Sequence, residues 1–370
     1  MPTYSIDSAI INNNLQLGTV SSGPTYILRW DPTDGFVKRT PEDILQTSSG
    51  VSKGVTGSIF VTDSDYTTLT GVGNVFMGKN VASQSTTATD NVLMGDKTAR
   101  DLTTGSRNVY IGSDTGKETV SASDNISIGK NTACKNVQGC RNVFLGSFAG
   151  EKSDANNNVF IGYESGKSVT QSNASTFIGS GAGRNHTSGL GVFVGYLAGN
   201  ENTTGDNNTY LGAYAGRYSQ EGRDNTVVGY LAGVGQTQSD CNTFVGSNAG
   251  RYGNGSGNVA FGYRAGECSN GSNNVYIGNV VGANKDWYGD SNVFLGANSG
   301  PTISATYSSS IAIGRNAIID SDNQLSIGSS AHFIGTASSA TWSGINLGEP
   351  SYWLDVKING IDGKLPIFTP

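Results

Sequence analysis

The sequence predicts an all-β fold, a parallel β-solenoid (β-roll) of about 16 coils, and three observations lead to this prediction. Glycine supplies 53 of the 370 residues, and because each helical glycine costs ~1 kcal/mol relative to alanine, a mainly helical chain is excluded. The glycines follow no Gly-X-Y period and the chain has only 8 prolines, which excludes collagen. From Asn74 onward one short phrase recurs every 16 to 18 residues, with a last spacing of 14, as in NVFLGSFAG and NVFIGYESG.

Each copy of the phrase is organised around a central glycine, which we define as position 0 of its coil. The sixteen central glycines are Gly78, Gly95, Gly112, Gly129, Gly146, Gly162, Gly179, Gly195, Gly212, Gly229, Gly246, Gly262, Gly278, Gly296, Gly314 and Gly328. Position −1 is always apolar, position −3 is Val, Ile, Leu or Thr, and position −4 is Asn in twelve copies. Position +3 is small and position +4 is usually a second glycine.

Positions −3 and −1 share one face of a short strand, because successive side chains alternate across a strand. Strands stacked at ~4.8 Å would form a continuous parallel sheet about 75 Å long, and we expect this face to fill the interior. Glycines at 0 and +4 would form corners with positive φ, where Gly229→Val is expected to be disruptive and Gly255→Ala, off these columns, milder. The Asn at −4 is expected at a corner, where it tolerates the left-handed region and its amide can bond to nearby backbone or to the Asn of the next coil.

Position −2 then points outward, and it is aromatic in ten coils. The ten residues are Phe76, Tyr110, Phe144, Phe160, Phe177, Phe193, Tyr210, Phe244, Tyr276 and Phe294. Because soluble monomers rarely expose so large an apolar stripe, we interpret this ladder as a permanent interface among three parallel chains. Two alternatives stay open: the ladder stacks on sugars, or the inside and outside of the strand are reversed.

The chain divides into three parts. Residues 1–56 form an N-terminal attachment region, with a hairpin over 26–37 around a Pro/Asp/Gly turn and a short helix over 40–46 that begins with Thr40 and Pro41. Residues 57–335 form the solenoid. Residues 336–370 form a C-terminal hairpin cap, because 352–360 alternates and a second apolar run follows. Such a hairpin would cover the open strand edge.

No catalytic, metal or cofactor site is predicted. The two histidines, His186 and His332, lie far apart without a nearby nucleophile or ligand set, and we expect them at the surface or at corners. Segment 162–168 resembles a phosphate-binding loop but is one residue too short. The four cysteines form no zinc or disulfide pattern. A net charge of −6 without a basic patch argues against nucleic acid, and no apolar run reaches the ~18 residues of a membrane span.

The N-x-V-x-I-G…A-G phrase resembles the head repeats of trimeric autotransporter adhesins. It is still more similar to the longer-period repeats in fibre proteins of tailed bacteriophages and contractile injection systems, over roughly residues 57–335. This resemblance implies a homotrimeric, receptor-binding fibre or spike on a virion or an extracellular injection particle. It also implies that the N-terminal region contacts other virion or baseplate proteins. The signal peptide and membrane barrel of autotransporters have no counterpart here, which favours the phage-like alternative.

Contact with a host surface glycan or protein is expected in the variable arcs between strands. The candidates are Arg217, Tyr218, Arg251, Tyr252, Trp287 and Tyr288. Aromatic rings beside cations suit sugar faces, whereas packing between coils or chains is the alternative role for these residues. Two other function classes stay open: the head of a bacterial surface adhesin, and a glycan-degrading tailspike with paired carboxylates.

Overall fold

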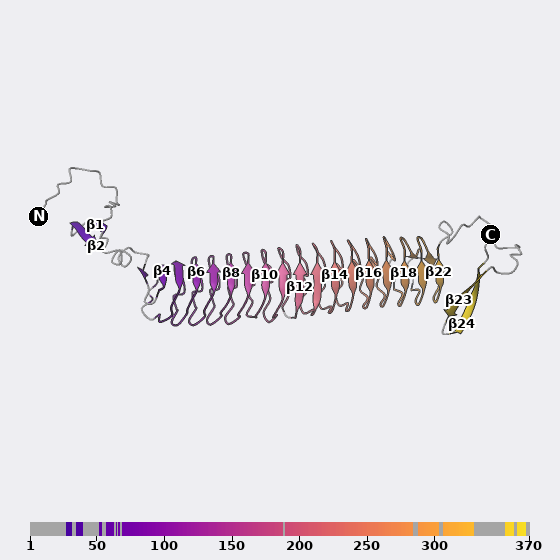
Figure 1. Cartoon of the computed structure of the whole chain (residues 1–370), viewed down its shortest axis with the longest axis horizontal. Helices are drawn as coiled ribbons and strands as arrows, with labels where there is room; N and C mark the ends of the chain where they lie inside the picture. Colours follow the sequence, from indigo (N-terminus) through magenta and orange to yellow (C-terminus); the bar gives the residue numbers. More distant parts are fainter. Residues whose placement is uncertain are drawn as a thin grey trace, which may run out of the picture. The chain divides into compact units, whose positions relative to one another are not determined.

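A computed structural model describes residues 27–31, 35–39, 52–53, 57–62, 64, 66, 69–187, 189–283, 288–302, 306–328, 352–358 and 361–367. Its main part is a parallel β-solenoid of about 15 turns with a period of about 17 residues. The strands of this part stand side by side in one row (Figure 1). The predicted fold class is therefore confirmed.

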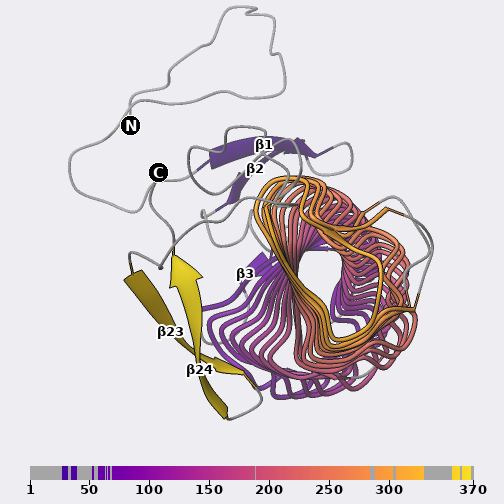
Figure 2. The same cartoon turned by 90° about the vertical axis from the view of Figure 1, so that its right-hand side faces the viewer.

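Each coil contributes one short strand to a single parallel sheet. The strands are β4 (Ile59–Thr62), β5 (Val75–Gly78), β6 (Val92–Met94), β7 (Val109–Ile111), β8 (Ile126–Ile128), β9 (Val143–Leu145), β10 (Val159–Ile161), β11 (Thr176–Ile178), β12 (Gly191–Val194), β13 (Asn208–Leu211), β14 (Thr226–Val228), β15 (Thr243–Val245), β16 (Val259–Phe261), β17 (Val275–Ile277), β18 (Val293–Leu295), β20 (Ile311–Ile313) and β22 (Leu325–Ile327). Each repeat position pairs with the same position of the next coil, as Phe160 does with Phe177. Viewed along the stack, successive coils overlie one another (Figure 2).

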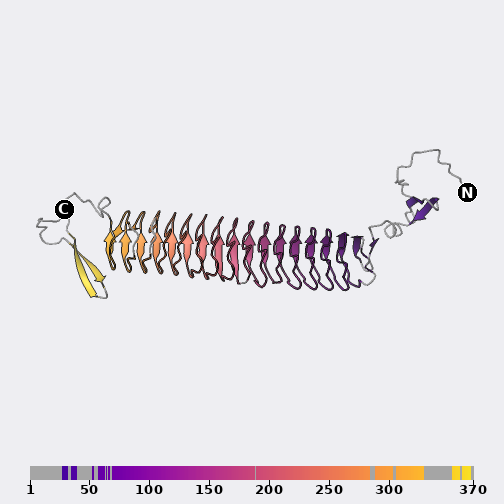
Figure 3. The same cartoon turned by 180° about the vertical axis from the view of Figure 1, so that it is seen from behind.

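Short pairings accompany this sheet. At its start β3 (Ser52–Lys53) pairs with β4 in the antiparallel sense. Near its end β19 (Gly300–Pro301) and β21 (Ile318–Ile319) form a separate parallel pair. The same row of strands is seen from behind in Figure 3.

The aromatic column at position −2 lies inside the solenoid, so the predicted orientation of the strands is wrong. All ten residues proposed for a trimer interface are no more than 3% exposed: Phe76, Tyr110, Phe144, Phe160, Phe177, Phe193, Tyr210, Phe244, Tyr276 and Phe294. They fill the core of the single chain and are not available to a second chain. The sequence left open that the inward and outward faces of the strand are reversed, and this alternative is the one observed.

The buried rings stack on one another at the spacing of the strands. Ring centroids of Phe160 and Phe177 are 4.8 Å apart, and those of Phe177 and Phe193 are 4.6 Å apart, with interplanar angles of 8° and 5°. The glycine at +4 makes room for each ring, since a Cβ at Gly166 would lie 2.6 Å from the Phe160 ring. The interior is therefore a column of rings faced by glycine and alanine.

The central glycines form the predicted corners. Their φ values lie between +112° and +141° from Gly78 to Gly314, a region that side chains other than glycine rarely adopt. A Cβ at Gly229 would also lie 2.4 Å from the carbonyl oxygen of Gly246 in the next coil. The expectation that Gly255→Ala is milder than Gly229→Val is not supported, because a Cβ at Gly255 would lie only 1.7 Å from the backbone oxygen of Gly271.

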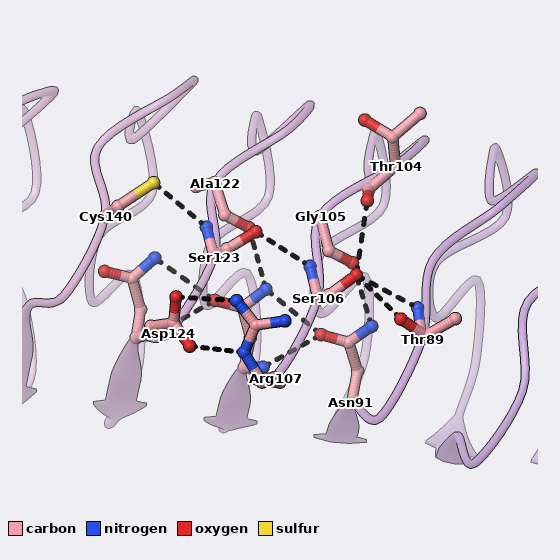
Figure 4. Close-up of polar contacts among 12 residues, drawn as sticks. Thr89, Asn91, Thr104, Gly105, Ser106, Arg107, Ala122, Ser123, Asp124 and Cys140 are labelled. Carbon is pink, nitrogen blue, oxygen red and sulfur yellow. Dashed lines mark hydrogen bonds and ion pairs between the residues drawn. The ribbon is translucent and has the colours of Figure 1, made fainter.

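Buried asparagines at −4 form a ladder through the interior. Both the backbone N–H and the side-chain amide of Asn91 donate to Oδ1 of Asn74, each at 3.1 Å. The same amide also donates to the Gly105 carbonyl at 3.0 Å (Figure 4). The predicted Asn–Asn bonds are confirmed. The left-handed residue is instead the one before, at −5, where Asp90 has a φ of 57°. There Arg107 pairs with Asp124 of the next coil (Figure 4).

Within the described residues of the solenoid, the hydrophobic core is interrupted once. One cluster of buried side chains runs from Phe60 to Tyr110 and a second from Ala133 to Ile319. Between them Ser127 occupies position −2, and its buried hydroxyl has no hydrogen-bond partner in the described part of the chain. The ring column is therefore broken at this coil.

Two hairpins lie outside the solenoid. In the first, β1 (Ile27–Asp31) pairs antiparallel with β2 (Gly35–Arg39). In the second, β23 (Tyr352–Ile358) pairs antiparallel with β24 (Ile361–Ile367), within a separate compact unit of residues 330–370. Both predicted hairpins are confirmed. The predicted helix over 40–46 lies outside the described residues, and the roles in attachment and capping stay predictions.

Candidate ligand-binding surfaces

The outward face of the long sheet is apolar and uncharged. Its two columns are positions −3 and −1, which carry only Val, Ile, Leu, Met, Phe or Thr in all sixteen coils. The side chains of Ile178, Leu211 and Phe261 are 36%, 41% and 58% exposed. We call these two columns the apolar sheet face. A surface of this length without charge is unusual on a monomer.

A second surface follows the central glycine. Position +1 carries an exposed tyrosine in every second coil, at Tyr163, Tyr196, Tyr230 and Tyr263, with serine or alanine in the coils between. Two strand spacings separate successive tyrosines, which places them ~9.6 Å apart along the stack.

Two aromatic side chains at position +2 pack against these tyrosines. Phe148 packs edge-on against Tyr163, with ring centroids 6.1 Å apart. Tyr214 packs edge-on between Tyr196 and Tyr230, at 5.2 and 6.1 Å. We define the tyrosine strip as Phe148, Tyr163, Tyr196, Tyr214, Tyr230 and Tyr263. The strip is a row of partly exposed rings on coils of one rigid sheet.

Cations at position +5 lie beside the strip. The Lys167 ammonium lies 4.9 Å from the Phe148 ring centroid, and the Arg217 guanidinium lies 5.3 Å from that of Tyr214. Glu164 bonds to Lys167 at 2.8 Å and pairs with Arg184 at 3.0 Å. Burial opposes ionisation of Glu164, but the hydrogen bond from Lys167 and the charge of Arg184 outweigh it and hold the pKa of Glu164 below its usual value.

Arg217 differs from the other cations at this position. Each of the others lies within ion-pair distance of a carboxylate: Arg100, Lys117, Lys167, Arg184 and Arg251. Among the described residues Arg217 makes no ion pair, and this distinguishes it from the others. Its buried Nε has no hydrogen-bond partner, as is also true of the Nε of Arg251. Its guanidinium lies between Tyr214 and Tyr218, 4.7 Å from the Tyr218 ring. The centre of the strip therefore holds a cation without an anion.

The predicted receptor-binding residues lie in separate coils. Arg217 and Tyr218 form one cation–π pair, and Arg251 and Tyr252 form another at 4.6 Å, two coils away. Tyr288 is 56% exposed, and Trp287 lies outside the described residues. Sequence reasoning missed the tyrosines at +1, although their alternation with small residues was a visible signal.

His186 is buried, which corrects the prediction of a surface or corner position. Its Nε2 lies 3.0 Å from the Gly189 carbonyl, and its Nδ1 lies 2.9 Å from the side-chain oxygen of Asn202. The ring packs edge-on against Phe177 and Phe193, because position +7 points into the interior. His332 lies outside the described residues.

Acid is expected to destabilise the solenoid through His186. Burial lowers the pKa of His186 below its ordinary value, so the unfolded chain, with a histidine pKa of about 6.5, binds the proton more readily. The free energy of unfolding is therefore highest above about pH 6.5, and it decreases as the pH falls below this value, because the unfolded chain then takes up the proton. Urea unfolding at pH 7.5 and pH 5 should show this loss. His186→Asn, which copies Asn136 and Asn202 at the same repeat position, should reduce the pH dependence; an unchanged pH dependence would contradict the assignment.

No protein-family model and no curated protein matches this chain. Within the described residues no helix has the length and apolar character needed to cross a membrane. In the same residues no three His, Cys, Asp or Glu side chains gather as metal ligands would, and none of the four cysteines forms a disulfide bond. The functional argument therefore rests on the apolar sheet face and the tyrosine strip.

Proposed function

We propose that this chain is a structural fibre or spike protein of a bacteriophage or phage-like injection particle, that it forms a homotrimer, and that it attaches the particle to a host surface. The observation that carries the proposal is the apolar sheet face. In this proposal the chains contact one another through the apolar sheet face, and not through the −2 aromatics, which are buried within each chain. The number of chains and the particle come from the resemblance of the repeats to those of trimeric fibres.

The dimensions and chemistry of the face fit a permanent contact between copies. A strip about 75 Å long and about 10 Å wide is close to the ~800 Å² that a stable interface buries on each partner. Neither column contains a charged residue in any coil, so no ion has to lose its water when copies associate. Parallel copies would also bring equivalent coils to the same height, because the repeat is regular. Apolar burial at ~25 cal/mol per Å² then favours association.

Charges placed on this face are expected to separate the chains without unfolding them. Ile178→Lys combined with Leu211→Lys puts two cations on the outward face, where both side chains are more than a third exposed. Light scattering should give about three times the chain mass of 38.4 kDa for the unmodified protein and a single chain mass for the variant.

The matched control is Gln220→Lys combined with Asn254→Lys, which adds the same charge at exposed positions in the arcs. This control should remain trimeric. A monomeric unmodified protein would overturn the proposed assembly.

The assignment to a particle needs a separate observation. Electron microscopy with an antibody against the solenoid is expected to label fibres or spikes on particles. Label confined to the cell surface would overturn this part of the proposal in favour of an adhesin.

A further inference from the structure

We infer that the tyrosine strip binds an acidic polysaccharide chain lying along the solenoid, with a sugar carboxylate paired to Arg217. This inference rests on the proposed function, because it names the ligand through which the particle would attach.

The spacing of the strip suits an extended chain of sugars. The apolar face of a sugar ring stacks on an aromatic ring, and an extended polysaccharide presents such faces at regular intervals. Tyrosines that recur every ~9.6 Å on a rigid stack lie close to the length of one disaccharide unit. Tyr196 and Tyr230, on either side of the Gly212 coil, would contact successive units of one chain.

The scaffold itself does not require these rings. The same position +1 holds serine, alanine, lysine or aspartate in other coils, for example Ser180, Ala213 and Lys130. The four tyrosines at +1 remain 48% to 53% exposed. Their side chains therefore contribute little to the core and are available to a ligand.

Arg217 specifies the charge of the ligand. Among the described residues its guanidinium has no carboxylate partner and lies beside the Tyr214 and Tyr218 rings, so an anionic ligand would supply the missing charge-assisted hydrogen bond. A carboxylate can accept two parallel hydrogen bonds from a guanidinium, whereas a neutral hydroxyl cannot match that geometry and charge. Because the carboxylates near the other +5 cations already pair with them, the unpaired cation at the centre of the strip favours an acidic sugar.

A second copy of the chain is a less suitable occupant. Contact between two identical strips about a two-fold axis would bring their Arg217 side chains toward each other, and like charges at an interface are unfavourable. The uncharged apolar sheet face has no such conflict. The two surfaces therefore differ in partner: a sugar chain for the strip and another copy for the sheet face.

Binding of polygalacturonate to the full chain, measured by titration calorimetry, tests the inference. We expect binding of polygalacturonate in preference to the neutral probe hydroxyethyl cellulose. Arg217→Gln should weaken binding about tenfold or more, as the loss of a charged hydrogen bond would. Tyr196→Ala combined with Tyr230→Ala should weaken it at least as much. Arg223→Gln, in the same coil but off the strip, is the matched control and should bind as the unmodified chain does.

The outcomes separate this inference from the proposed function. Failure of the unmodified chain to bind polygalacturonate, alginate and hyaluronate would overturn the inference, and so would equal affinity of the strip variants. Light scattering on each variant reports assembly independently. A trimer that binds none of these sugars leaves the proposed assembly standing, whereas a monomer that binds them overturns the assembly alone. Strip variants that lose the trimer would place the strip in the interface and overturn the inference.

Discussion

Replacing Gly229 by alanine is expected to cost about 3 kcal/mol or more of unfolding free energy. Two independent obstacles act at this corner between β14 and the following arc. The φ of +140° is strained for any residue with a side chain. The new Cβ would also lie 2.4 Å from the oxygen and 2.6 Å from the carbon of the Gly246 carbonyl group. Both atoms belong to the backbone of the stacked coil, so relief requires the coils to separate.

Gly233→Ala, four residues later, is the matched control. Its φ is +57°, and a Cβ there would lie 3.1 Å from the Val227 side chain. Ala99 and Ala133 already adopt this conformation at the same repeat position, so we expect a cost of about 1–2 kcal/mol. Urea unfolding followed by circular dichroism measures both, and hydrogen exchange should locate the loss at the Gly229 and Gly246 coils. Equal costs would show that position 0 is not a special corner.

Phe177→Ala is expected to cost about 3–5 kcal/mol, the range for removal of a buried aromatic ring. The ring is fully buried. It stacks on Phe160 and Phe193 in the adjacent coils and contacts the edge of His186. Its loss would leave a gap in the ring column that the stacked strands cannot close, because their spacing is held by backbone hydrogen bonds.

Tyr263→Ala removes a ring of similar size from the outside and is the control for this prediction. Tyr263 is 48% exposed, and a surface substitution of this kind is expected to change stability by about 0.5 kcal/mol. Equilibrium unfolding in urea compares the two. If Phe177→Ala were no more costly than Tyr263→Ala, the −2 column would not form the core.

The period and the corners could be predicted because they depend on local backbone conformation. Glycine at 0 and +4 requires positive φ wherever the coil occurs, and the hairpins follow from turn residues between apolar runs. The asparagine ladder was also accessible, since identical amides recur at the stacking interval. Each of these features appears within one coil or in strict register with the next.

The orientation of the strands could not be predicted from alternation, because both faces of the strand are apolar. In a segment such as Val159–Ile161 no polar residue marks the side that faces water. The residue types at positions −2 and +4 of the same coil did contain a signal of the orientation. Leu93 and Ser127 at −2 are accompanied by Ala99 and Ala133 at +4 instead of glycine, which indicates contact between the two positions through the interior. Exceptions to this pairing are Phe76, accompanied by Ala82, and the non-aromatic Val227 and Ala260, accompanied by Gly233 and Gly266.

The candidate site was predicted only in part. Arg217 and Tyr218 were found because they are neighbours in the sequence. The rest of the strip comes from residues 33 or 34 positions apart, from Tyr163 to Tyr196, Tyr230 and Tyr263. Their proximity follows from the stacking of coils and is not visible in any single repeat.

The break in the ring column at Ser127 has a mechanical consequence. In a solenoid each coil holds only its immediate neighbours. At this coil no aromatic ring lies between those of Tyr110 and Phe144. The coil is held to its neighbours by backbone hydrogen bonds and by the side-chain bonds from Asn125 to Asn108 and from Asn142 to Asn125. We expect a solenoid pulled from its two ends to part first at this coil, where the apolar core is interrupted, and the tyrosine strip to stay intact on the longer fragment.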